Sequence, residues 1–344
     1  MRACILILSS LIALLLVACF PAAAPATTAP AAPTTAPQGT THIQVALGFV
    51  PSVQSAPYYV AQDKGYYAAE GLDVDLKYGT IQNLLKQVSD GSIEFASVSG
   101  DSLMPQKQQG VDVVYVMTFW TKNPIGALGI AGNNNPPLKA PADLKGKNLG
   151  ISAPNSSTHF ALKALLQMAN LKEDDVKVTA IGTTEVEALI QKRIDAAMTF
   201  LPNEAAQMKS LGYGVDTIAV YDYLKLVPPG VATGSKTMNE RADVVQRFVR
   251  ATLRGLKETL DNPDAAFASS LKRMPELTPE TQPLQRDVLR ATLDYYKPVQ
   301  GRTLGATEPD AWPATQDFLK SIGVVNQSLD PSQYYTNKFV DAAR

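Results

Sequence analysis

The sequence predicts an α/β protein built from two similar lobes, and three observations carry this prediction. Stretches that alternate between polar and apolar residues, as strands do, are interleaved with amphipathic helical segments, which is the pattern of parallel strands joined by crossover helices. A break rich in Asn and Pro, Asn133 to Pro137, interrupts the pattern. The same order of elements then starts again, which indicates a second lobe of similar construction.

The first series begins at Ile43–Phe49, which alternates as a strand does and stops at Pro51. Gly71–Tyr78 alternates in the same way, and the segment between the two is helical in pattern. Because successive strands are separated by helices, we expect them to be parallel, with ligands beyond their carboxyl ends. The other elements expected ahead of the break are helices at Ala56–Ala68 and Ile81–Asp90 and strands at Glu94–Ser99, Val111–Phe119 and Ile125–Ala131.

The second series starts at the strand Asn148–Ser152. A long amphipathic helix, Asn239–Leu260, opens a mostly helical remainder, because its apolar residues form one stripe. The other expected elements are helices at Ser157–Asn170, Glu185–Lys192, Asp264–Lys272, Thr281–Tyr295 and Asp310–Ile322, strands at Val176–Ile181 and Ala196–Thr199, and two strands between Thr217 and Thr233.

The composition excludes several classes of function. The 344 residues include 31 Lys and Arg against 32 Asp and Glu, so the chain lacks the basic excess of a nucleic-acid-binding protein. Its two cysteines, Cys4 and Cys19, precede the expected folded body, which leaves no structural disulfide and no cysteine-based metal site there. The two histidines, His42 and His159, are too few for a His-rich metal site. We expect no cofactor and no metal.

The first forty residues have the pattern of a signal and a tether. Arg2 precedes an apolar run, Ala3–Val17, that is typical of a signal peptide and too short to span a membrane comfortably. Leu16-Val17-Ala18-Cys19 resembles the lipobox of bacterial lipoproteins, in which cleavage leaves the cysteine as the lipid-bearing N-terminus. An ordinary secretory signal cleaved nearby is the alternative.

The segment after Cys19 is almost entirely Pro, Ala and Thr and carries no charge as far as Thr41. Such a composition predicts an extended, semi-rigid spacer. We therefore expect residues 1–18 to be a signal peptide and residues 19–41 to be a lipidated linker. The body would then lie on the extracytoplasmic face of the cell membrane, held there by its lipid anchor.

Short motifs along the body resemble solute-binding proteins of ABC importers. Phe49-Val50-Pro51-Ser52, followed by the run from Tyr58 to Val74, is similar to the opening of the branch that serves thiamine pyrimidine precursors, riboflavin, sulfonates and nitrate. Further matches in the expected order are Gly91–Ala96, Pro141–Lys147 and Arg193–Ala197. The order and spacing of these motifs, more than any one of them, carry the resemblance.

The resemblance implies a type II periplasmic-binding-protein fold, in which two α/β lobes joined by two strands hold the ligand between them. It implies a first lobe at 42–132, to which residues 226–344 return, and a second lobe at 133–225. The protein would be a monomer that captures a small vitamin and delivers it to a permease subunit and, through it, to an ATPase. No nucleic-acid partner and no catalysis are implied.

Candidate ligand contacts lie where the expected strands end toward the cleft. Aromatic side chains suit stacking on a flat heterocycle, and acids, amides and hydroxyls suit hydrogen bonds to its polar groups. Core packing or helix capping is the alternative for each residue. We expect His159 at a cap or in solvent. The candidates are Phe49, Gln54, Tyr58, Tyr78, Ser99, Asp101, Trp120, Asn155, Ser156, Thr158, Phe200, Asn203 and Glu204.

The opening around Phe49 to Ala61 looks more like the riboflavin-binding members, so riboflavin is the expected ligand. A thiamine pyrimidine precursor and a sulfonate are the alternatives. Relatives that take the pyrimidine usually show an Asn and a His after the first strand, where this chain has Pro51-Ser52-Val53-Gln54.

One enzyme interpretation competes with binding. Gly100-Asp101-Ser102-Leu103 resembles the nucleophile block of GDSL-type esterases. That chemistry needs an imidazole to take the serine proton, and the esterase family supplies it near the C-terminus. The chain has no histidine after His159, so we expect a binding protein. A purely structural surface lipoprotein is a third class, which predicts no ligand.

Overall fold

A computed structural model describes residues 39–343 apart from residues 49, 80 and 135. The predicted signal peptide, the lipid-bearing Cys19, most of the linker and the candidate Phe49 therefore lie outside the described residues. Within the described part, every helix is too short or too polar to cross a bilayer.

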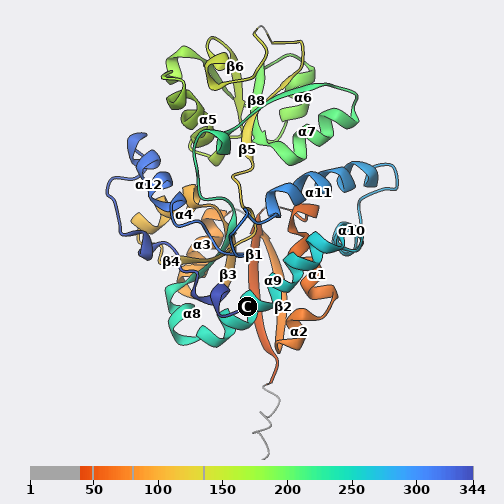
Figure 1. Cartoon of the computed structure of the whole chain (residues 1–344), viewed down its shortest axis with the longest axis vertical. Helices are drawn as coiled ribbons and strands as arrows, with labels where there is room; N and C mark the ends of the chain where they lie inside the picture. The colour runs from red at the N-terminus through yellow and green to blue at the C-terminus, as the bar shows by residue number, and fades with distance from the viewer. Residues whose placement is uncertain (1–38, 49, 80, 135, 344) are drawn as a thin grey trace, which may run out of the picture. The chain divides into compact units, whose positions relative to one another are not determined.

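The first sheet has five strands in the order β2-β1-β3-β10-β4 (Figure 1). β1 is parallel to β2 and to β3, whereas β10 is antiparallel to both β3 and β4. The strands are β1 (Thr41–Gly48), β2 (Leu72–Gly79), β3 (Phe95–Val98), β4 (Val113–Thr118) and β10 (Gly230–Gly234). The parallel part agrees with the predicted alternation of strands and helices, and the reversed strand comes from far along the chain.

The second sheet follows the same plan in the order β7-β6-β8-β5-β9. β6 is parallel to β7 and β8, and β5 is antiparallel to β8 and β9. The strands are β5 (Ile125–Ile130), β6 (Asn148–Ile151), β7 (Lys177–Ala180), β8 (Ala196–Phe200) and β9 (Val215–Ala219). The prediction of two similarly built α/β lobes is confirmed.

Helices cover both faces of the sheets. In the second sheet, α5 lies on one side and α6 and α7 on the other (Figure 1). The helices of the first half are α1 (Ala56–Asp63), α2 (Tyr66–Ala69), α3 (Ile81–Asp90), α4 (Gly100–Gln108), α5 (Ser157–Met168), α6 (Glu185–Ile190) and α7 (Leu201–Ser210). Those of the second half are α8 (Ser235–Glu240), α9 (Ala242–Asp261), α10 (Pro263–Leu271), α11 (Gln282–Tyr296), α12 (Ala311–Ser321) and α13 (Lys338–Asp341). Short 3-10 turns are η1 (Val53–Ser55), η2 (Pro141–Leu144), η3 (Glu173–Asp175), η4 (Val220–Asp222) and η5 (Pro331–Gln333).

Four of these helices, α4, α7, α8 and α13, are not among the predicted elements, although the predicted helix Asn239–Leu260 overlaps the end of α8. The α4 segment contains Pro105 inside the helix, and its apolar residues do not form a clear stripe. The α7 segment has Pro202 in its first turn, where proline is well tolerated because the N–H it lacks has no partner there. Helix α7 starts directly after β8, and α4 starts one residue after β3, at strand ends where we expect ligand contacts.

The chain passes between the two sheets at residues 119–124 and again at residues 220–229. The expected division placed Ile125–Ala131 in the first lobe, because the Asn/Pro break after it is the clearest interruption in the sequence. Instead, β5 pairs with β8 and β9 of the second sheet. We propose that the lobes divide at these two crossovers.

The long helix α9 packs on the segment that resembles the importer family. The Tyr67 hydroxyl lies 3.0 Å from Thr252 Oγ1, and its ring is parallel to that of Phe248 with centroids 5.6 Å apart. Gly255 lets α9 approach α1 closely, because a Cβ there would overlap the Pro57 carbonyl oxygen. These contacts hold α9, which follows β10 in sequence, against the first sheet.

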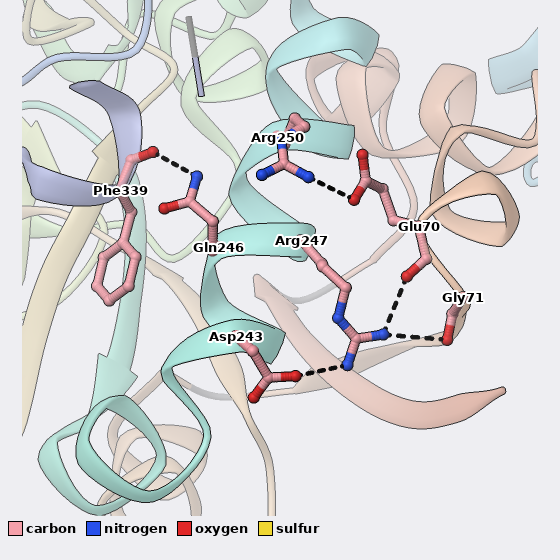
Figure 2. A network of polar contacts seen from close by, with 7 residues as sticks. All are labelled: Glu70, Gly71, Asp243, Gln246, Arg247, Arg250 and Phe339. Atoms are coloured by element: carbon pink, nitrogen blue, oxygen red, sulfur yellow. Dashed lines mark hydrogen bonds and ion pairs between the residues drawn. The ribbon is translucent and has the colours of Figure 1, made fainter. Parts of the chain in front are cut away.

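Arginines of α9 hold the turn that leads into β2 (Figure 2). Arg250 Nη1 donates to Glu70 Oε2 over 2.8 Å, and Arg247 Nη1 donates to the Glu70 carbonyl over 3.0 Å. Arg247 also donates to Asp243 on its own helix, 2.9 Å away. Gly71 follows with φ of 66°, a left-handed conformation that favours glycine. The turn lies at the amino end of β2, so these motif residues stabilise the fold and lie at the end of the strand opposite to the expected cleft.

Candidate functional site

Ser99, Asp101 and Ser157 bring the two lobes together at the N-termini of α4 and α5. Ser99 follows β3, and its hydroxyl donates to Asp101 Oδ1 in the first turn of α4. Ser102 Oγ lies 3.4 Å from Ser157 Oγ, the first residue of α5 in the second lobe. Ser99 and Asp101 are therefore at the carboxyl end of β3, as predicted, and the neighbouring Ser102 contacts the first residue of the predicted helix Ser157–Asn170.

Asp101 is almost completely buried, with 2% of its surface exposed. Burial raises the pKa of its carboxyl group, while hydrogen bonds from the Ser157 and Ser99 hydroxyls and from the backbone N–H groups of Asp101 and Ser102 act in the opposite direction. A carboxylate at the start of a helix also interacts favourably with the helix dipole. The group is thus a buried acid enclosed by hydrogen-bond donors.

The turn from Ser152 to Thr158 forms its own hydrogen-bond network. Ser156 caps α5, because its Oγ accepts from the His159 N–H over 3.3 Å, and it donates to the Ala153 carbonyl over 2.7 Å. Thr158 Oγ1 accepts from the Ser152 N–H over 3.0 Å and lies 2.9 Å from Ser152 Oγ. The capping alternative for Ser156 is what the structure shows, and the turn's hydroxyls are preorganised by one another.

Asn155 and His159 complete this turn. Asn155 has φ of 58°, which asparagine tolerates better than most residues, and its N–H donates to His159 Nδ1 over 3.0 Å. His159 Nε2 lies 3.1 Å from Glu173 Oε1, so these partners place the ring proton on Nε2. The imidazole is buried, with 7% exposed, instead of capping the helix or facing solvent as expected. It connects α5 to η3.

Neither histidine serves Ser102 as a base in the part of the chain that the structure describes. His159 contacts Asn155 and Glu173, and His42 Nδ1 lies 2.9 Å from Asp73 Oδ2 on the edge of the first sheet. The hydroxyl neighbours of Ser102 are those of Ser99 and Ser157. The GDSL-like block is therefore the start of a helix at the junction of the lobes.

Gln54 and Trp120 lie against α11, a helix that comes far later in the sequence. The Gln54 backbone carbonyl accepts from the Tyr296 hydroxyl, and the Gln54 side-chain Nε2 lies 3.5 Å from Thr292 Oγ1. The Trp120 ring is edge-on to Tyr295 and Tyr296, with centroids 5.7 and 5.3 Å apart, and the residue is 5% exposed. Trp120 therefore packs in an aromatic group, and the two tyrosines are site neighbours that sequence reasoning missed.

Tyr58 and Tyr78 occupy different environments. Tyr58 is 2% exposed and its ring meets Phe119 edge-on at 4.7 Å, so it is a core residue. Its hydroxyl is oriented toward Ser97 without a hydrogen bond of normal geometry, and burial raises its pKa well above the usual value. The Tyr78 hydroxyl lies 3.0 Å from that of Tyr59, and burial raises its pKa as well.

Phe200, Asn203 and Glu204 mark the end of β8 and the start of α7. Asn203 Nδ2 donates to Glu204 Oε1 over 2.7 Å, whereas Glu204 Oε2 is buried without a hydrogen-bond partner. Burial raises the pKa of Glu204, while hydrogen bonds from the Thr199 and Asn203 side chains act in the opposite direction. Burial and the nearby Glu204 also raise the pKa of Glu185, at the start of α6. A buried acceptor without a donor is a candidate for an N–H or O–H group of a ligand.

A cavity of about 210 Å³ lies between the two crossovers and the segment after α11. Trp120 lines it, together with Lys122, Tyr221, Arg302 and Glu308; none of the other described candidates does. Lys122 Nζ lies over the Tyr221 ring, 5.1 Å from its centroid, and Glu308 pairs with Arg302 over 3.2 Å. Among the described residues, no group of three His, Cys, Asp or Glu side chains is arranged to hold a metal ion.

Comparison with known proteins decides the family. Residues 52–266 match the model described as NMT1/THI5 like. The chain belongs to the NMT1/THI5-like family. It is 35% identical to the riboflavin-binding protein RibY of Chloroflexus aurantiacus, over 99% of this chain and 98% of that one. It is 23% identical to the formylaminopyrimidine-binding protein of Halalkalibacterium halodurans, over 80% of this chain and 84% of that one.

The solved structures agree on the fold of this NMT1/THI5-like chain. The periplasmic aliphatic sulphonate binding protein SsuA from Escherichia coli superposes with a TM-score of 0.67 at 17% identity, covering 85% of this chain and 91% of that one. The chain has the two-lobe type II periplasmic-binding-protein fold that its motifs implied. Residues near the candidates that the sequence did not single out are Glu185, Tyr295 and Tyr296.

Proposed function

We propose that this protein binds riboflavin outside the cytoplasmic membrane and delivers it to an ABC importer. The observation that carries the proposal is the match to a riboflavin-binding protein, 35% identical over essentially the whole chain. The two-lobe fold supports it, because ligands of such open α/β sheets bind beyond the carboxyl ends of the strands.

The fold also suggests how the protein would work. A ligand that contacts both lobes favours the closed arrangement by its differential contacts, and a membrane partner can distinguish closed from open protein. The partners in this proposal are a permease subunit and, through it, an ATPase. The protein would act as a monomer, without a cofactor, and would release its ligand unchanged.

The proposed binding site combines aromatic surfaces with polar groups from both lobes. The free Glu204 Oε2 would accept from a ring N–H or a ribityl hydroxyl, and the ordered turn before α5 would donate to ligand oxygens. Tyr58 is the weakest member, because it lies in the core, and Asp101 would contribute through the groups that it holds in place. The full set is Phe49, Gln54, Tyr58, Tyr78, Ser99, Asp101, Trp120, Asn155, Ser156, Thr158, Phe200, Asn203 and Glu204.

We further propose that Cys19 carries the lipid that anchors the protein. The lipobox-like Leu16-Val17-Ala18-Cys19 supports this, together with the uncharged Pro/Ala/Thr spacer after it. Mass analysis of the N-terminal peptide from the native membrane should show a diacylated Cys19, and Cys19→Ser should move the protein out of the membrane fraction. An unmodified N-terminus after Ala22 to Ala24 would identify an ordinary secretory signal instead.

Titration of the purified full chain with riboflavin tests the ligand, with flavin fluorescence and heat as readouts. One-to-one quenching supports the proposal. No quenching and no heat of binding with riboflavin, but a heat of binding with formylaminopyrimidine, would favour the second candidate. The 23% identity to a formylaminopyrimidine-binding protein suggests this candidate. An alkanesulfonate is the third titrant. Ester hydrolysis that Ser102→Ala abolishes would overturn the binding class altogether.

A further inference from the structure

The N-termini of α4 and α5 meet across the two lobes. Helix α4 starts where β3 of the first sheet ends, and α5 starts after β6 of the second sheet. Ser102 Oγ of α4 lies 3.4 Å from Ser157 Oγ of α5. Asp101 lies beside this contact with only 2% of its surface exposed. A charged group of the first lobe is therefore buried against the second.

The Asp101 carboxylate is already supplied with donors. Ser99 Oγ donates to Oδ1, and the Ser157 hydroxyl and the backbone N–H groups of Asp101 and Ser102 are directed at the same carboxylate. These donors offset part of the cost of burying the carboxylate. Glu204 differs, because its Oε2 is buried without a hydrogen-bond partner. Asp101 is enclosed by groups of the protein, among them Ser157 of the second lobe.

We propose that Asp101 is a positioning residue: through Ser157, its carboxylate in the first lobe holds the N-terminus of α5 and the adjoining Ser152–Thr158 turn in the second lobe. Two helix N-termini carry partial positive charge and disfavour each other, and a carboxylate between them removes that cost. The hydroxyls of the turn are tied together by Ser156 and Thr158, so the turn moves as one piece with α5. When the lobes close, the Ser152–Thr158 turn is aligned at the same time. The ligand-binding consequence rests on the proposed function.

The test uses the full chain with Asp101→Asn, which keeps the size of the side chain but turns an amide N–H₂ toward donors. We expect the backbone amides of Thr158 to Leu162, in the other lobe, to exchange with deuterium several-fold faster, and riboflavin to bind roughly tenfold more weakly, the effect of losing one charge-assisted hydrogen bond. Ser99→Ala is the matched control. It removes a donor to the same carboxylate within the first lobe, and it should leave exchange at α5 unchanged.

A double-mutant cycle with Ser157→Ala separates positioning from direct ligand contact. If Asp101 acts through Ser157, the double variant binds riboflavin no more weakly than Asp101→Asn alone. Additive losses of affinity would place Asp101 on the ligand and overturn the proposal, as would unchanged exchange at α5 in Asp101→Asn. If Asp101→Asn does not fold, the Ser157→Ala chain must by itself show faster exchange at Ser102 and Leu103. If the native chain does not bind riboflavin, the proposed function fails, and the exchange results alone decide the role of Asp101.

Discussion

Arg250 on α9 donates from Nη1 to Glu70 Oε2, 2.8 Å away and 180 residues earlier in the chain (Figure 2). Glu70 is in the middle of the segment that most resembles the importer family, and only 14% of its side chain is exposed. The contact therefore ties a helix that follows the second crossover to the start of β2. It explains why a recognisable motif lies away from the proposed ligand cleft: the motif is needed to assemble the first lobe.

Arg250→Ala should lower the free energy of unfolding by about 1–3 kcal/mol, because it leaves the largely buried Glu70 carboxylate without its cation. Urea unfolding followed by circular dichroism measures the change. Arg290→Ala is the control, since Arg290 and Asp287 are both exposed and 3.8 Å apart, and such pairs contribute little. Riboflavin affinity should be unchanged in folded Arg250→Ala; a loss of affinity without a loss of stability would contradict this role.

Trp120→Ala should weaken riboflavin binding by about 1–3 kcal/mol if the indole stacks on the flat ring system. The chain has one other tryptophan, Trp312, whose ring is buried between Tyr115 and Tyr335. Quenching of tryptophan emission by riboflavin should therefore persist in Trp312→Phe and be lost largely in Trp120→Ala. Unchanged affinity in Trp120→Ala would restrict this residue to packing against Tyr295 and Tyr296.

Glu204→Gln should change stability and binding in opposite directions. Because burial raises the pKa of Glu204, the folded protein holds the proton to a higher pH than the unfolded chain, where the ordinary value is about 4.5. The native protein thus loses stability as pH rises from the unfolded pKa through the folded one, and glutamine, which does not titrate, avoids this loss.

At pH 7 the Glu204→Gln variant should be more stable, by up to about 1 kcal/mol, and the difference should vanish near pH 4. Thermal unfolding at several pH values measures it. The same variant should bind riboflavin more weakly, because it loses the charged acceptor. A stability gain that persists unchanged at pH 4 would show that titration of Glu204 is not its cause.

Gly255→Ala should destabilise the protein by about 1–3 kcal/mol, although alanine is the better helix former. The new Cβ would overlap the Pro57 carbonyl oxygen and lie 2.8 Å from Ala61 Cβ, and the backbone there cannot give way without separating α1 from α9. Gly48→Ala is the control, since its Cβ would enter open space. Denaturant unfolding of both variants tests the close approach; equal stabilities would show that the helices separate at little cost.

Most of the fold could be predicted from local patterns. The alternating strands and the stripe on α9 are properties of neighbouring residues, so their order was recovered with ends that differ by a few residues. The placement of β5 and β10 was not, because sheet pairing depends on partners about 70 or more residues away, such as Phe200 for Ile125. The Asn/Pro break at 133–137 falls between β5 and β6 of the same sheet and has no bearing on where the chain crosses.

The candidate site was predicted less completely. The rule that ligands lie beyond the carboxyl ends of strands predicted Ser99, Asp101 and the turn before α5 as candidates. The structure places Ser99 and Asp101 next to Ser157. The rule did not separate Tyr58, which packs in the core, from residues that have a free polar group. It also missed Tyr295 and Tyr296, because the helix that covers Gln54 and Trp120 lies more than 160 residues further along the chain.

The reversed strands have a consequence for the order in which the chain acquires structure during synthesis. Among the described strands of the first sheet, β4 pairs with β10 alone, which the ribosome makes more than 110 residues later. The whole second lobe is therefore synthesised while β4 still lacks its sheet neighbour. The first lobe is begun first and completed last, so a chain halted between the lobes would expose unpaired strand edges, the surfaces on which aggregation starts.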